Sequence, residues 1–155
     1  MLTVSDGVVA GTREDASGDL LTGLLEADGY VVERRVVPDE AAEVAAAIVE
    51  LAENAPVVLT TGGTGVAPRD VTPEATRSVI DREAPGIAEA IRADSLAKTP
   101  HALLSRGIAG IHGGTLVVNL PGSPGGCRDG YAVLQPALGH ALGLLAGADT
   151  AHRQT

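Results

Sequence analysis

Two aspartates, Asp39 and Asp70, are the side chains of this 155-residue chain best suited to chemistry. Each follows an apolar segment, residues 31–37 and 57–61, that we expect to be a strand of a parallel sheet. Two carboxylates beside a triphosphate can hold Mg²⁺, which neutralises charge as a phosphoryl-type group is transferred. Each also has a plainer interpretation, Asp39 as the cap of the next helix and Asp70 as a turn-stabilising residue.

The strand at 57–61 runs into a loop almost free of side chains, Gly62-Gly63-Thr64-Gly65. Glycines let the backbone adopt positive φ and approach a ligand, so that consecutive N–H groups converge on an anion. This is not a Walker loop, because the only lysine, Lys98, lies far downstream, and Pro68 rules out a dinucleotide fingerprint. A tight turn alone would need only one glycine.

The residues after this loop add to an anion site. Arg69 can contact a phosphate or pair with a neighbouring acid. Thr72 is a natural N-cap, with Pro73 at the first helical position and Glu74 behind it, which predicts a helix from about 73 to 82. The positive end of that helix would face the glycine loop.

Alternating apolar strands and helices predict a three-layer α/β/α fold with a mostly parallel central sheet. We expect strands at 1–4, 31–37, 57–61 and 115–120, an irregular loop at 5–19, and a short helical or irregular piece at 101–106. Helices are expected at 17–29, 41–54, 73–82 and 87–96, and a final helical segment from the polar turn at 121–126 to 146. Pro136 either kinks this final segment or starts a second helix within it.

In such sheets, ligands bind at the carboxyl ends of the strands. Four predicted strand ends carry polar or glycine-rich residues, so the candidate binding residues are Ser5, Asp6, Thr61, Gly62, Gly63, Thr64, Gly65, Arg69, Thr72, Glu74, Ser105, Asn119, Pro121, Gly122 and Ser123. Ser105 and Arg106 close a bend before the last strand and either reach the site or pair with a helix end. The turn at 119–124 is suited to a planar heterocycle.

Composition predicts a single domain over residues 1–155, with 147–155 as a frayed tail. The core must be built from small side chains, because 45% of residues are apolar but the chain has two Tyr and neither Phe nor Trp. Such a composition often leaves apolar surface to be buried between subunits. The first strand is short, so we expect that a few residues are missing ahead of it.

Charge and cysteine content limit the partners and the compartment. A net charge of −9 without basic runs argues against nucleic acid and anionic membranes. The single cysteine, Cys127, excludes an internal disulfide and fits a reducing cytosol, and neither a secretion signal nor a membrane span is visible. The histidines are too scattered for a metal cluster, and no nucleophile–base pair stands out, which favours transfer chemistry by positioning and charge.

Three segments together, TTGGTGVAPRDVTPEAT (60–76), LSRGIAG (104–110) and LVVNLPGSPGG (116–126), resemble the molybdopterin-binding domain of molybdenum-cofactor biosynthesis proteins, shared by bacterial Mog and MoaB proteins and by the G domains of plant and animal homologues. The resemblance runs from VSDG (4–7) to the final helix. It implies molybdopterin adenylyltransferase activity, in which the molybdopterin phosphate attacks the α-phosphorus of Mg-ATP and pyrophosphate leaves.

The resemblance also implies roles for single residues. The two essential aspartates of the family match Asp39 and Asp70, which would hold the Mg²⁺. Its glycine loop matches residues 62–65, and its pterin rim matches the regions of Ser105 and 119–123. His112 stands where many relatives carry a basic residue, which would weaken contact with the pterin phosphate.

The resemblance further implies a homotrimer, sometimes paired into hexamers, with a molybdenum insertase as a possible partner, and the cysteine content favours the cytoplasm. Two alternatives stay open at this point. One is a molybdopterin carrier or scaffold of the MoaB type without turnover. The other is a different pterin enzyme, such as a carbinolamine dehydratase, which would want a proton-shuttling histidine in its pocket.

Overall fold

The computed structural model describes residues 1–147, which form a six-stranded sheet in the order β2-β1-β3-β6-β5-β4. The four strands β1 (Leu2–Val4), β2 (Arg35–Val37), β3 (Val57–Thr61) and β6 (Thr115–Leu120) run parallel. The remaining two, β4 (Arg82–Glu83) and β5 (Ala109–His112), form an antiparallel edge. The expected mostly parallel sheet is therefore confirmed.

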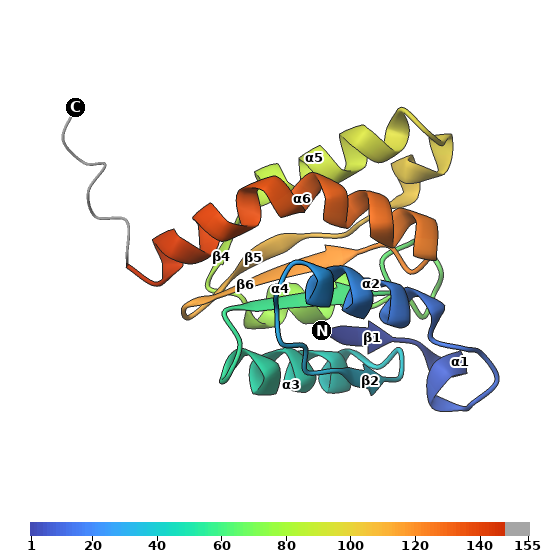
Figure 1. Ribbon diagram of the computed structural model, residues 1–155. Helices are drawn as coiled ribbons and strands as arrows, with labels where there is room; N and C mark the ends of the chain where they lie inside the picture. The colour runs from blue at the N-terminus through green and yellow to red at the C-terminus, as the bar shows by residue number, and fades with distance from the viewer. Residues whose placement is uncertain (148–155) are drawn as a thin grey trace.

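Helices cover both faces of this sheet, as the three-layer prediction requires (Figure 1). One face carries α2 (Ala16–Ala27), α5 (Pro85–Leu96) and α6 (Pro124–Leu145). The other carries α3 (Ala41–Ala52) and α4 (Thr72–Val79). Two short helices, α1 (Asp6–Val9) and the 3₁₀ helix η1 (Pro100–Leu104), lie in connections. No helix among residues 1–147 is long and apolar enough to cross a membrane.

The side chains of β6 alternate between two separate cores, because successive residues of a strand point to opposite faces. Leu116, Val118 and Leu120 pack under α2, α5 and α6, whereas Val117 packs under α3 and α4. All six residues of the strand are buried. The continuous apolar run of the sequence thus reflects burial on both faces.

Several predicted element bounds were wrong. Strand β2 starts at Arg35 rather than at 31, because it pairs only with the three residues of β1, and Val31 is fully exposed. A short helix, α1, interrupts the expected loop at 5–19, since Ser5 caps it by accepting from the Val8 N–H. Helix α3 ends at Ala52 and α4 at Val79, each short of its predicted end.

Both predicted helix caps were also wrong. Glu40 precedes α3 without a side-chain cap, and the Asp39 carboxylate bonds elsewhere. Thr72 is the first residue of α4 and donates its hydroxyl to Gly62 O at 2.9 Å. Helix α6 continues through Pro136, so no second helix starts there. Gly29, with φ +88°, follows the end of α2. The predicted frayed tail lies, apart from Gly147, outside the described residues.

Candidate functional site

The carboxyl ends of the four parallel strands lie side by side at one edge of the sheet, as the sequence predicted. Ser5 follows β1, Gly62 follows β3 and Pro121 follows β6. Asp39 comes two residues after β2. Thr61 ties two of these ends together by donating its hydroxyl to Pro121 O at 2.8 Å.

Two cavities open at this edge, and they share one wall. The first, of about 420 Å³, lies between the glycine loop and α5, η1 and the start of α6. The second, of about 520 Å³, lies between the glycine loop and the segment from β1 to the start of α2. The shared wall consists of Gly63, Asp70, Gly122 and Ser123.

At its glycines and at the adjoining Gly62, this wall is bare main chain because the packing there leaves little room for a side chain. Gly62 and Gly63 have φ of +97° and +65°. A Cβ on Gly62 would lie 2.2 Å from Val4 O, and one on Gly63 would lie 2.4 Å from Thr72 Oγ1. Gly122 also packs tightly, since its Cβ would lie 3.1 Å from Gly62 Cα. The glycines thus serve close approach as well as the turn.

Asp39 lines the second cavity and is held by the loop after β1. Its Oδ2 accepts from the Asp6 N–H at 2.8 Å, and its own N–H donates to Asp6 Oδ1 at 3.0 Å. The other carboxylate oxygen, Oδ1, would lie 3.1 Å from a Cβ on Gly63. This reciprocal pair places the carboxylate beside the glycine loop.

Arg69 lines neither cavity, because its guanidinium is bound to acidic side chains outside them. It donates to both carboxylate oxygens of Asp6, at 2.5 and 3.1 Å, and to Glu40 Oε1 at 2.9 Å. These bonds raise the pKa of Arg69 and, together with the Asp39 N–H, lower the pKa of Asp6. Asp6 lines neither cavity and instead links Arg69 to Asp39.

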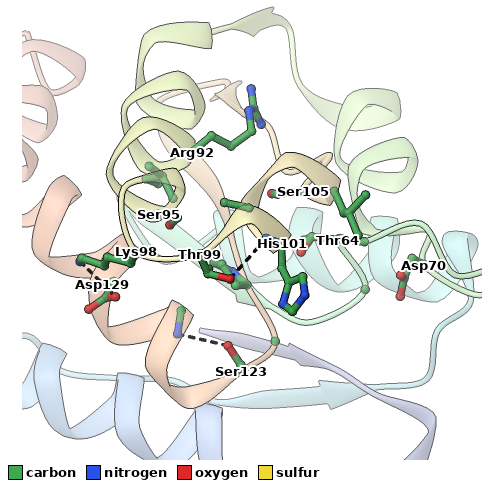
Figure 2. A pocket seen from close by; sticks show the side chains of 18 residues that line it. Thr64, Asp70, Arg92, Ser95, Lys98, Thr99, His101, Ser105, Ser123 and Asp129 are labelled. Carbon is green, nitrogen blue, oxygen red and sulfur yellow. Dashed lines mark hydrogen bonds and ion pairs between the residues drawn. The ribbon is translucent and has the colours of Figure 1, made fainter.

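Asp70 lines both cavities, and Figure 2 shows it among the residues of the first. Its Oδ2 accepts from the Ala67 N–H at 2.9 Å, and its N–H donates to Ala67 O at 2.9 Å. Asp70 therefore does have the turn-stabilising role weighed from the sequence. Only one of its carboxylate oxygens is used in this way among the described residues, so a cation can bind at the other.

Each of the other predicted site residues lines the first cavity, the second cavity or neither. Thr64, Gly65, Ser105 and Pro121 line the first, and Ser5, Thr61 and Gly62 line the second. Thr72, Glu74 and Asn119 line neither: Thr72 is buried, Glu74 pairs with Arg106, and Asn119 is hydrogen-bonded inside the fold. The expectation that Asn119 forms a ligand rim is therefore not met.

His112 also lies away from both cavities. It ends β5 opposite Thr115, the first residue of β6, whereas the cavities follow the last residue of that strand. Its Nδ1 bonds to Val79 O at 2.6 Å. The position of His112 therefore does not support the expectation that this residue weakens contact with the pterin phosphate.

The first cavity contains polar residues that sequence reasoning missed. Lys98 bridges Asp94 on α5 and Asp129 on α6, at 2.7 and 3.0 Å, and Figure 2 shows it at the side opposite Asp70. His101 lines the same cavity from η1. A signal existed, since Lys98 is the only lysine and lies four residues after Asp94. The pairing with Asp129 depends on nonlocal packing of α5 against α6.

The donor set suits a cation that is shared with a substrate. Among residues 1–147 no group of three or more His, Cys, Asp or Glu side chains could hold a metal alone. Mg²⁺, however, is often bound by one or two carboxylates together with substrate phosphates. Asp39 and Asp70, both lining the second cavity, fit that arrangement.

Residues 1–140 match the family model described as "Probable molybdopterin binding domain". The chain belongs to this family. It is 46% identical to MoaB from Thermus thermophilus, a molybdopterin biosynthesis enzyme of known structure, with a TM-score of 0.87 and 94% of each chain covered. It is 39% identical to the molybdopterin adenylyltransferase of Haemophilus influenzae, over 92% of this chain and 75% of that protein.

Longer relatives contain the same domain. Gephyrin from Dictyostelium discoideum is 39% identical over 94% of this chain, which spans only 22% of that protein. The chain therefore corresponds to one part of such proteins. The family and these relatives support a role in molybdenum cofactor biosynthesis.

Proposed function

We propose that the chain is a molybdopterin adenylyltransferase, which transfers AMP from Mg-ATP to the molybdopterin phosphate and releases pyrophosphate. The observation that supports this most is the pair of cavities that share one wall, with Asp70 lining both. A transfer between two bound substrates needs such a shared wall, because the reacting groups must meet in a fixed geometry.

The cavities suggest which substrate binds where. The first contains the predicted pterin rim, Ser105 with Pro121 to Ser123, and would take the pterin. The second contains Asp39 and Ser5 and would take the triphosphate. The N-terminus of α6, capped by Ser123, begins at the shared wall and favours an anion there.

The proposed reaction needs no strong general base. An oxygen of the molybdopterin phosphate forms a bond to the α-phosphorus of ATP, and the bond from that phosphorus to the leaving pyrophosphate breaks. The attacking oxygen is already anionic, so the protein must align it and stabilise charge. Asp39 and Asp70 would hold the Mg²⁺ that offsets triphosphate charge, while the amides at 62–65 bind phosphate oxygens.

Asparagine substitutions of both aspartates test this proposal, because they remove charge and keep shape. With purified molybdopterin, ATP and Mg²⁺, we expect Asp39→Asn and Asp70→Asn each to slow pyrophosphate release by about 100-fold or more. Molybdopterin binding should stay within about twofold of the wild type, since few of its contacts change. Asp19→Asn, on the exposed side of α2, is the matched control.

Other outcomes of the same assay favour the alternatives. Tight pterin binding without molybdopterin-dependent pyrophosphate release would favour a carrier. The dehydratase alternative has one observation behind it, because His101 lies in the first cavity. Turnover of a pterin carbinolamine that is lost in His101→Ala would support that activity instead.

The proposal extends to assembly and location. Exposed apolar side chains such as Val31, Val66 and Leu103 suit a homotrimer, or a hexamer built from two. A net charge of −9 disfavours nucleic-acid and anionic-membrane partners. We place the protein in the cytoplasm, with a molybdenum insertase as the partner that receives its product.

A further inference from the structure

Arg106 binds both ends of the loop that runs from Thr64 to Asp70. Its main-chain N–H donates to Thr64 O at 2.8 Å, and its Nε donates to Gly65 O at 2.6 Å. One terminal nitrogen donates to Asp70 O at 2.6 Å, and the other pairs with Glu74 on the first turn of α4. A single residue thus connects the start of the loop, its end and the helix that follows.

The chemistry of these bonds leaves the Asp70 carboxylate available. The guanidinium binds the main-chain carbonyl of Asp70 and not its side chain, whose Oδ2 accepts instead from the Ala67 N–H. Glu74 balances the positive charge of Arg106, and that guanidinium lowers the pKa of Glu74. A cation at Asp70 would therefore not compete with Arg106 for the carboxylate.

We propose that Arg106 is a positioning residue that fixes the loop from Thr64 to Asp70 and so holds the Asp70 carboxylate in the wall shared by the two cavities. The inference deepens the proposed adenylyl transfer, in which Asp70 holds the metal, and its catalytic part rests on it. Arg106 lines neither cavity, and it acts through Asp70.

Lysine cannot replace arginine in this role. The planar guanidinium presents its donors in a fixed fork, whereas an ammonium is a single charged point on a flexible stem. Arg106→Lys would keep the charge and the main-chain bond to Thr64 O, but it could not hold Gly65 O, Asp70 O and Glu74 in the observed geometry. It therefore separates geometry from charge.

The direct test is amide hydrogen exchange, which needs no substrate. In Arg106→Lys we expect the amides of Ala67 and Asp70 to exchange about tenfold faster or more, because the hydrogen bonds between these residues loosen with the loop. Amides of β6, such as that of Val117, should keep their wild-type rates. Arg77→Lys is the matched control, since Arg77 pairs with Glu83 outside the loop.

The kinetic test uses molybdopterin, ATP and a Mg²⁺ titration. In Arg106→Lys we expect kcat to fall about tenfold or more and half-maximal Mg²⁺ to rise, while KM for molybdopterin changes less than about twofold. Glu74→Gln, which keeps the three bonds to carbonyls, should have a smaller effect. The control Arg77→Lys should match the wild type.

The outcomes separate the two proposals. Unchanged loop exchange, or equally faster exchange in β6, would overturn the positioning role, and so would unchanged kcat and Mg²⁺ dependence. If the wild type releases no pyrophosphate, the proposed function fails, and exchange at Ala67 and Asp70 still decides whether Arg106 fixes the loop.

Discussion

At the scale of single residues, Asn119 shows that a residue of a binding motif can act entirely inside the fold. Its Nδ2 donates to Thr60 Oγ1 and Thr76 Oγ1, at 3.0 and 2.9 Å, and its Oδ1 accepts from the Ile108 N–H at 3.2 Å. The side chain therefore connects β6 with β3, α4 and the segment before β5. Through these bonds Asn119 stabilises the edge of the sheet at which the cavities open.

Truncating the Asn119 side chain should lower the stability of the fold without removing a contact to a ligand. We expect Asn119→Ala to lower the free energy of unfolding by about 3 kcal/mol, because it leaves buried groups unpaired. Asn54→Ala, at an exposed position after α3, should change it by less than about 0.5 kcal/mol. Urea unfolding measures both, and weaker molybdopterin binding at unchanged stability would contradict this role.

Asp39 and Arg69 show where residue-level prediction stops. The position of Asp39 after a strand placed it at the correct edge, because strand ends of a parallel sheet converge. The partners were not predictable, since Arg69 meets Asp6 across 63 positions of sequence. Spacing indicates which edge a residue reaches, but side-chain direction depends on contacts that only the folded chain supplies.

At the scale of elements, prediction succeeded where a segment is buried on both faces. Strand β6 occupies the predicted 115–120, because its apolar run has no polar alternation. In contrast, β4 and β5 were missed because they are short and their pairing is nonlocal. Gly110 of β5 reflects that pairing, since a Cβ there would lie 2.7 Å from Arg82 O.

Two glycines of α6 give an element-scale prediction with a built-in control. A Cβ on Gly139 would meet nothing within 4 Å, whereas one on Gly130 would lie 3.0 Å from Leu120 Cδ2. We expect Gly139→Ala to stabilise the protein by about 1 kcal/mol, because alanine loses less backbone entropy in a helix.

Gly130→Ala gains the same helix propensity but crowds the contact between α6 and β6. Its unfolding midpoint in urea should therefore lie below that of Gly139→Ala, at unchanged m-value. Equal stabilisation by both substitutions would show that α6 does not pack as closely on Leu120 as the structure indicates.

At the scale of the whole molecule, two titratable side chains in the core beneath α6 should make the folded protein less stable as the pH becomes alkaline. Cys127 and Tyr131 both lie on the buried face of this helix. Burial raises the pKa of the Cys127 thiol from 9.0 to about 11. Burial, followed by the hydrogen bond to Asp28 at 2.7 Å, raises the pKa of Tyr131 above its ordinary value of 10.0.

The direction of the effect follows from proton counts. Above pH 9 the thiol of the unfolded chain loses its proton while the folded chain keeps it, so rising pH favours unfolding until both have ionised near pH 11. The stability that Cys127 contributes is fully present below pH 9 and is lost between these values. Tyr131 acts in the same direction, starting about one pH unit higher.

This predicts a difference between the wild type and Cys127→Ala that grows with pH. From pH 8 to pH 10 the wild type should lose about 1 kcal/mol more of its free energy of unfolding than the variant, as measured by urea titration at each pH. The other titrating groups, including Tyr131, are the same in both proteins, so their contributions to the pH dependence cancel in the difference. Parallel pH profiles would mean that the thiol is ionised as easily in the folded chain as in the unfolded one, which a side chain packed inside the core between α6 and the sheet does not allow.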